Sequence, residues 1–360
     1  MRLMRGFGVL LAALLVTGGT VPAVTAQAAV TATRPAYGNP DGHVRVPPAA
    51  RAVSTKHPDH VVGTGTPASC TGAAVVRAVA KGGIIVFHCG PHPVTITMRA
   101  TAKVVNTSHY VVIDGGGLVT LNGAGRREIL YQNACDPKQK ITTTDCYDQQ
   151  WPHLIVQNLK FENGNNPVRQ PKNSSFYGGG AIFALGGQVK VVNSDFVNNQ
   201  CYKHGPDLGG AAIRVLGQWK NHPVYITRDT FKGGRCSNGS ALSSIGVSWQ
   251  VYDSVMRNNK AVGWGANPAA SGTKGGGSGG AIYTDGDTYS LLVAGTIIEN
   301  NSAREGGGAI FFVSDDNTGK LTIKDSTLRK NPSGVFWTRP YPGIYYHSAG
   351  VPKIINSIIQ

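Results

Sequence analysis

A two-part repeat runs from about Leu154 to the last residue, and it constrains the fold of this chain more than any other feature. One part is a glycine-led strand start of the type Gly-Gly-Ala-Ile, with copies at residues 179–182, 209–211, 279–282 and 307–310 and a degenerate copy at 240–242. The other part is an apolar residue, a small polar turn, an apolar anchor and asparagines, as in residues 192–199. The anchors are Phe161, Phe196, Phe231, Met256, Ile298, Leu328 and Ile359, at steps of 35, 35, 25, 42, 30 and 31 residues. A period of roughly 20–50 residues with β-type alternation and glycine punctuation predicts a solenoid of stacked coils.

The composition agrees with stacked turns and narrows the class of partner. Only 15% of the 360 residues are charged and 48 are glycine, whereas 41% are hydrophobic, which is enough for a core. The formal net charge is 34 − 19 = +15, which favours polyanions such as acidic polysaccharide, cell-wall polymers or anionic membrane. No long Lys/Arg run with interleaved aromatic residues occurs, so we do not expect nucleic acid as a partner.

The first 28 residues have the pattern of a secretory signal peptide. Arg2 and Arg5 precede an apolar stretch, and residues 26–28 place alanine at both positions that define cleavage. Removal of this segment takes away two arginines, which leaves a charge of about 15 − 2 = +13. Residues 29–68 have no sustained periodicity and are interpreted as a Pro/Arg-rich linker or arm, and residues 69–360 as the solenoid domain. No later run of about 18 apolar residues occurs, so a secreted or cell-surface protein without a transmembrane segment is expected.

Six cysteines in a secreted chain predict three disulfides. Cys201 and Cys236 each lie five residues after an anchor, so they are expected to lie above one another on adjacent coils. Cys135 and Cys146 close a short polar excursion at residues 131–150, and Cys70 and Cys89 bracket a predicted helix and strand.

Both ends of the solenoid and one of its corners have predictable features. Thr71 caps a predicted helix over residues 72–80, which Gly82 ends and which covers the first coil. The position three before each anchor is Asn or Asp in five of seven repeats, and these residues tolerate left-handed backbone, so a structural corner column is predicted there. The last residues lie inside a copy of the repeat, and an uncapped C-terminal coil is a candidate surface for oligomerisation.

The pairing of Gly179-Gly180-Ala181-Ile182 with Phe196 and Asn199 resembles the repeats of chlamydial-type polymorphic membrane proteins. More broadly, residues 70–360 look like a pectin-lyase-like, single-stranded right-handed parallel β-helix. That superfamily contains pectate lyases, polygalacturonases, phage tailspikes and adhesins, and the resemblance implies three sheets per coil with substrates across the first sheet. One fold of this kind hosts many chemistries, so the resemblance alone does not choose among them.

The resemblance makes the strand after Gly-Gly-Ala the substrate-side strand. If its isoleucines and leucine point inward, alternation places an aromatic and cationic column outward, formed by Phe183, Arg214, Ser243, Tyr283 and Phe311. We expect Phe183, Arg214, Tyr283 and Phe311 to bind an acidic sugar chain. The alternative is that the column stacks on itself or lies under loops.

An acidic group lies just beyond that column. Asp287 and Asp315 have equal offsets in adjacent repeats, and Asp285 and Asp316 belong to the same two coils. Paired carboxylates about 5 Å apart suit glycan cleavage, because like charges at that separation raise one pKa and supply an acid. The same group suits Ca²⁺, with Asp287 and Asp315 as ligands, although no cofactor is required. Ordinary turn chemistry is the third interpretation.

Two functions from different classes follow. The first is an enzyme, a polysaccharide lyase or glycoside hydrolase that acts on acidic polysaccharide through the four aspartates. The second is a non-catalytic, adhesin-like surface protein that binds wall or host glycans. The repeat resemblance favours the second function, and the acidic group favours the first.

Overall fold

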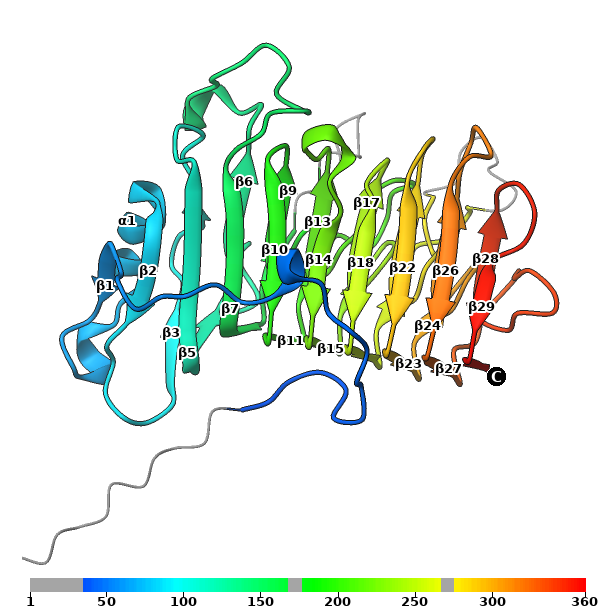
Figure 1. Cartoon of the computed structure of the whole chain (residues 1–360), viewed down its shortest axis with the longest axis horizontal. Helices are drawn as coiled ribbons and strands as arrows, with labels where there is room; N and C mark the ends of the chain where they lie inside the picture. Colours follow the sequence, from blue (N-terminus) through cyan, green and yellow to red (C-terminus); the bar gives the residue numbers. More distant parts are fainter. Residues whose placement is uncertain (1–34, 168–176, 267–274) are drawn as a thin grey trace, which may run out of the picture. The chain divides into compact units, whose positions relative to one another are not determined.

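The repeat folds into a parallel β-helix in which each coil contributes strands to three sheets (Figure 1). The computed structural model describes residues 35–167, 177–266 and 275–360, and the predicted signal peptide lies outside them. The described residues belong to one compact unit, Arg34–Gln360. Every pairing between named strands is parallel, which confirms the predicted fold class. Among the described residues, no helix is long and apolar enough to cross a membrane.

The largest sheet, sheet A, bends into two limbs. Two long strands, β5 (Tyr110–Asn122) and β7 (His153–Glu162), run through both limbs. The first limb contains β1 (His60–Val62), β2 (Gly83–Phe87), β10 (Gln188–Val192), β14 (Val224–Thr227), β18 (Trp249–Tyr252), β22 (Ser290–Ala294), β26 (Lys320–Lys324) and β29 (Lys353–Ile355). The second limb contains β3 (Val94–Thr97), β11 (Asp195–Val197), β15 (Thr230–Lys232), β19 (Val255–Arg257), β23 (Ile297–Glu299), β27 (Thr327–Arg329) and β30 (Ile358–Ile359).

Two smaller sheets complete each coil. Sheet B contains β4 (Ala102–Lys103), β6 (Leu130–Asn133), β9 (Ile182–Leu185), β13 (Ile213–Leu216), β17 (Leu242–Ile245), β21 (Ile282–Asp285), β25 (Ile310–Val313) and β28 (Ile344–His347). Sheet C contains β8 (Asn165–Asn166), β12 (Gln200–Cys201), β16 (Arg235–Cys236), β20 (Lys260–Ala261) and β24 (Ser302–Ala303). Short 3-10 turns lie between strands: η1 (Pro48–Ala50), η2 (Pro67–Ser69), η3 (Pro137–Gln139) and η5 (Trp219–Asn221).

The anchors stack in the predicted register. Each one pairs with the next along the solenoid, from Phe161 with Phe196 to Leu328 with Ile359. The first three form a continuous ring stack, with centroids 5.0 and 4.7 Å apart. The anchors before Ile359 are at most 1% exposed, so unequal repeat lengths are absorbed by loops and not by slips in register.

The predicted corner column separates the two limbs of sheet A. All seven residues have left-handed φ between 44° and 61°: Asn158, Asn193, Arg228, Asp253, Gly295, Asp325 and Asn356. From the second of these coils on, the next position bears a side-chain oxygen that accepts a hydrogen bond from the backbone of the preceding coil, as Ser254 Oγ does from Asp229 N at 3.1 Å. In the first of these coils the position is Leu159. The buried asparagines after the anchors form a second ladder, in which Asn259 donates to Asn301 and Asn301 to Asn331. Both columns are structural, as predicted.

The capping helix and the disulfides are also confirmed. α1 (Gly72–Lys81) extends one residue beyond the predicted end, Thr71 Oγ1 accepts from Ala74 N, and Gly82 ends the helix with φ +75°. The disulfides are Cys70–Cys89, Cys135–Cys146 and Cys201–Cys236, the three predicted pairs.

Residues 35–59, the described part of the predicted linker or arm, pack along sheet A as an arm (Figure 1). Tyr37 N donates to Asn193 Oδ1 at 3.0 Å, and Val44 N donates to Asp253 Oδ1 at 3.3 Å. Val53 exchanges two hydrogen bonds with the side chain of Gln157. The corner side chains therefore supply the bonds that fix the arm.

Candidate functional site

The aromatic column of sheet B has the predicted register but lies under loops. Phe183, Arg214, Ser243, Tyr283 and Phe311 are neighbours on successive strands. Phe183, Arg214 and Tyr283 are at most 4% exposed, and Phe311 is half-buried. Tyr131, the neighbour of Phe183 on β6, stacks on it within the column, and Cys135 of the Cys135–Cys146 excursion packs beside them. The expected sugar-binding face is therefore a buried layer in this structure, as in the alternative interpretation.

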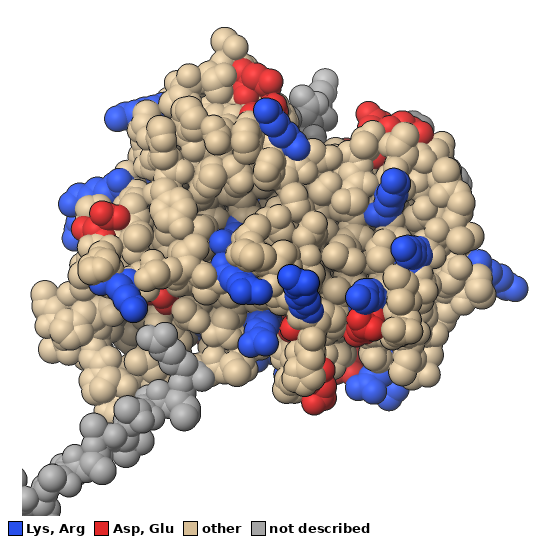
Figure 2. All heavy atoms as spheres, viewed as in Figure 1, with Lys and Arg blue, Asp and Glu red and all other residues tan. Residues whose placement is uncertain are grey.

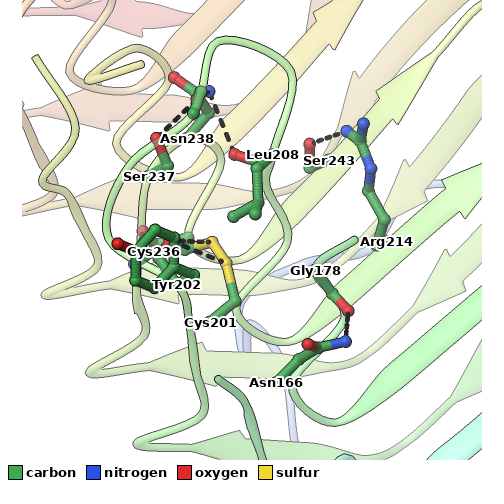
Figure 3. Close-up of a disulfide and its surroundings, with 12 residues drawn as sticks. Asn166, Gly178, Cys201, Tyr202, Leu208, Arg214, Cys236, Ser237, Asn238 and Ser243 are labelled. Carbon is green, nitrogen blue, oxygen red and sulfur yellow. Dashed lines mark hydrogen bonds between the residues drawn. A yellow bond between two sulfur atoms is a disulfide. The ribbon is translucent and has the colours of Figure 1, made fainter. Parts of the chain in front are cut away.

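Arg214 is buried and forms hydrogen bonds within the protein. Its guanidinium donates to Ser243 Oγ at 2.5 Å and to the carbonyl oxygen of Asp207 (Figure 3). Burial lowers the pKa of Arg214 to about 10, and the charges of Tyr283, Asp207 and Asp285 partly offset this effect. The interactions of Arg214 with Ser243 and Asp207 join the loop before β13 to sheet B, close to the Cys201–Cys236 disulfide.

Two of the four predicted catalytic aspartates, Asp285 and Asp316, are held by local hydrogen bonds. Asp285 accepts from Tyr283 Oη at 2.7 Å and from Gly286 N at 2.9 Å. Burial raises the pKa of Asp285, and the charge of Asp315 adds to this rise. Asp316 accepts from Thr318 N, Thr288 Oγ1 and Ser314 Oγ, and these hydrogen bonds hold the pKa of its carboxyl below the usual range. Asp285 is thus paired with the buried column, and Asp316 closes its own turn.

Asp287 and Asp315 are both exposed, and their described contacts are backbone contacts. The carbonyl oxygen of Asp287 accepts from Ser314 Oγ at 3.0 Å, and Asp315 N donates to Gly286 O at 2.9 Å. Within the described residues, no group of three or more His, Cys, Asp or Glu side chains is arranged to hold a metal ion. Ca²⁺ at Asp287 and Asp315 stays a prediction.

Sequence reasoning missed Glu128, a partly exposed residue whose carboxyl group lies in a buried environment. Glu128 accepts from Asn166 Nδ2 at 3.1 Å in the loop before β6. Burial raises the pKa of Glu128 to about 8, although Asn166 and Lys103 act in the opposite direction. Glu128 lies outside the repeated positions, so no periodic signal in the sequence marks it.

The open surface is the first limb of sheet A together with the arm. Figure 2 shows Lys and Arg side chains across the middle of this view. Strand alternation makes this pattern, because Val189 and Val191 point into the core while Lys190 points out, and the same holds for Lys320 and Lys324 around Leu321 and Ile323. Further exposed cations on this surface are Arg45, Arg51, Arg228 and Lys353.

Comparison with known families finds a single repeat. Residues 295–313 match the model of the Chlamydia polymorphic membrane protein repeat. This segment contains the corner residue Gly295, the anchor Ile298, Asn301 and the glycine-led start at 307–310, so it carries both parts of the repeat. Comparison with curated proteins and with solved structures gave no match. The repeat is thus similar to that of Chlamydia polymorphic membrane proteins, and the wider pectin-lyase-like relation remains a prediction from the residues.

Proposed function

We propose that this protein is an extracellular, surface-associated β-helix that binds acidic polysaccharide without cleaving it. Three disulfides fit a protein that folds in an oxidising, extracellular environment. The polymorphic membrane protein repeat supports a surface role. The formal charge of +15 favours a polyanionic partner.

The exposed cationic surface of the first limb is the observation that carries this proposal. Lys320 and Lys353 belong to adjacent strands, β26 and β29, where Lys353 pairs with Thr322, so the two lysines lie diagonally, two residues apart in register. Lys324 and Arg228 lie along the corner of the limb, where each forms an ion pair, with Asp325 at 3.7 Å and with Asp253 at 4.0 Å, so they add less positive charge than Lys320 and Lys353. A row of exposed cations on a flat, repetitive surface suits an extended chain with regularly spaced carboxylates or sulfates.

Cleavage of the same polymer is a second candidate function, and Asp285 is the observation that favours it. A carboxyl group with a raised pKa beside a second carboxylate is a common arrangement for a general acid. Binding without cleavage is preferred because the neighbouring Tyr283 and Arg214 are buried and because Asp316 is used by its turn.

Chromatography on immobilised polygalacturonate, alginate and a glycosaminoglycan tests the proposal. Lys320→Gln/Lys353→Gln removes two cations from adjacent coils of the first limb and should elute at lower salt than the unmodified protein. Arg235→Gln/Lys260→Gln removes two exposed cations from adjacent coils of sheet C and is the matched control. Equal elution of both variants, or no retention of the unmodified protein, would refute binding through the first limb. New reducing ends or unsaturated ends in the polymer, abolished by Asp285→Asn, would establish cleavage instead.

A further inference from the structure

A small pocket lies on the first limb, at the place where the arm crosses it. The pocket has a volume of about 160 Å³ and is lined by Ala49, His153, Gln188, Lys190, His222 and Tyr225. Ala49 belongs to η1, which lies over β10 and β14, and His222 follows η5 (Figure 1). The volume is below the roughly 300–1,000 Å³ of sites for drug-sized ligands, so it suits one sugar unit of a longer chain.

The side chains of this pocket are basic and aromatic. Lys190 Nζ donates to Ala49 O at 3.0 Å; an ammonium group has three donors, and this is its only acceptor among the described residues. His153 Nε2 and Gln188 Nε2 are 2.6 Å apart, so the amide donates to the neutral imidazole. Trp219 stacks on His222 with ring centroids 4.6 Å apart, which holds that imidazole in place. Tyr225 is the neighbour of Lys190 on β14 and adds a ring to the pocket wall.

We propose that this pocket binds a single anionic sugar unit, a uronate or a sulfated hexose, with Lys190 on the anion and His153, His222 and Tyr225 around the ring. The proposal rests on the proposed polysaccharide binding and gives it a specific subsite. A carboxylate or sulfate accepts charge-assisted hydrogen bonds from an ammonium group. Sites for small ligands are typically lined by aromatic and apolar side chains, with a few polar groups that orient the ligand.

The charges around His153 predict how binding depends on pH. The charged groups that act on His153 are His222, His109 and Lys190, and all are basic. Burial lowers the pKa of His153 most, the hydrogen bond with the backbone of Gln150 opposes this effect, and the neighbouring charges lower the pKa further. A bound anion opposes these effects, so it favours the protonated imidazole and binds more tightly at lower pH. We expect affinity to rise about fivefold between about pH 7.5 and about pH 5.5.

Titration of the full secreted chain with galacturonate, galactose 6-sulfate and neutral galactose, followed by NMR of the histidine rings at constant salt, tests the proposal. The two anionic sugars distinguish a uronate from a sulfate, and galactose should give no saturable change. Lys190→Gln should weaken binding about 10- to 100-fold, because a hydrogen bond to a charged group is lost. His222→Gln, which leaves the contact of Lys190 with the arm intact, should also weaken binding. Lys353→Gln removes a cation from the same limb outside the pocket and should change affinity about twofold at most.

The outcomes separate this inference from the proposed function. If Lys190→Gln and Lys353→Gln weaken binding equally, the pocket proposal is overturned while polymer binding by the first limb stands. If no polymer is retained, the proposed function fails, and the sugar titrations still decide about the pocket. Absence of a saturable shift of His153 with either anionic sugar would overturn the pocket proposal by itself.

Discussion

Asp229 should make the stability of this protein fall as the pH rises. Asp229 directly follows the corner residue Arg228. The equivalent residues in the other coils form a ladder of polar side chains beside the corner: Ser194, Ser254, Thr296, Ser326 and Ser357. Asp229 is 0% exposed and accepts from Ser194 N at 2.6 Å and Thr227 N at 2.9 Å. Burial nevertheless raises the pKa of Asp229 well above its ordinary range, and Asp195 adds to this rise. Desolvation of the carboxylate thus outweighs its two hydrogen bonds.

The sign of the pH dependence follows from this raised pKa. An unfolded aspartate loses its proton near pH 3.9, whereas native Asp229 keeps its proton to higher pH. Between these two pKa values the native state binds more protons than the unfolded state, so the free energy of unfolding is highest below about pH 4 and falls as the pH rises. One proton corresponds to about 1.4 kcal/mol per pH unit. The fall ends when the native carboxyl group also ionises.

Asp229→Ser replaces the carboxyl group by the hydroxyl group found at most other positions of the ladder. The variant should therefore lack the pH dependence of the unfolding free energy that arises from Asp229. The free energy of unfolding of the variant minus that of the unmodified protein should grow by about 1.4 kcal/mol per pH unit above about pH 4. Urea denaturation at several pH values between about 4 and 7 measures this difference directly. Subtraction also removes the contributions of Asp195 and Asp285, whose pKa values are raised in both proteins. Ser254→Asp adds a carboxylate one coil further along and should have the opposite slope. A difference that stays flat with pH would refute the reasoning.

Three further predictions concern stability. Phe196→Ala removes the middle ring of the anchor stack and should cost about 3–5 kcal/mol in urea denaturation, so a loss below about 1 kcal/mol would contradict the role of the stack. Cys201→Ser/Cys236→Ser removes the disulfide that joins residues 35 positions apart and should lower the free energy of unfolding by about 3–4 kcal/mol. Because this disulfide is absent from the variant, adding reductant should lower its stability less than that of the unmodified protein. Glu128→Gln should remove a fall in stability between about pH 4.5 and about pH 8, seen as a flatter pH profile of the unfolding free energy; an unchanged profile would place the titration elsewhere.

Most of the fold could be predicted from the sequence because the repeat itself determines it. Equal spacing from an anchor places residues on neighbouring coils, so the registers from Phe161 to Ile359 and the Cys201–Cys236 pair follow from counting. Asn and Asp three residues before the anchors indicated a left-handed corner, and φ is positive there even at Arg228.

The exposure of the candidate site could not be predicted in the same way. The repeat spacing correctly predicts that Phe183, Arg214 and Tyr283 lie in one column of sheet B. Their burial depends also on loops outside the repeat, which the spacing does not describe. The packing of such segments depends on single contacts, for example the hydrogen bond between Arg214 and the carbonyl of Asp207. The arm is a similar case, because its backbone bonds to Asn193 and Asp253 leave no periodic pattern in residues 35–59.

These non-repeating segments also determine where a polymer can bind. Sheet B has the aromatic residues that suit a sugar chain, but most of its column is buried, whereas Lys190, Lys320 and Lys353 point out of sheet A. The arm crosses that sheet near β10 and β14, where η1 and the loop after η5 form the walls of the pocket around Lys190. Lys320 and Lys353 lie on β26 and β29, beyond the crossing, and stay exposed. A bound chain would therefore have one unit held in the pocket and further units over the open lysines, which predicts that oligomers bind more tightly than single sugars through the same limb.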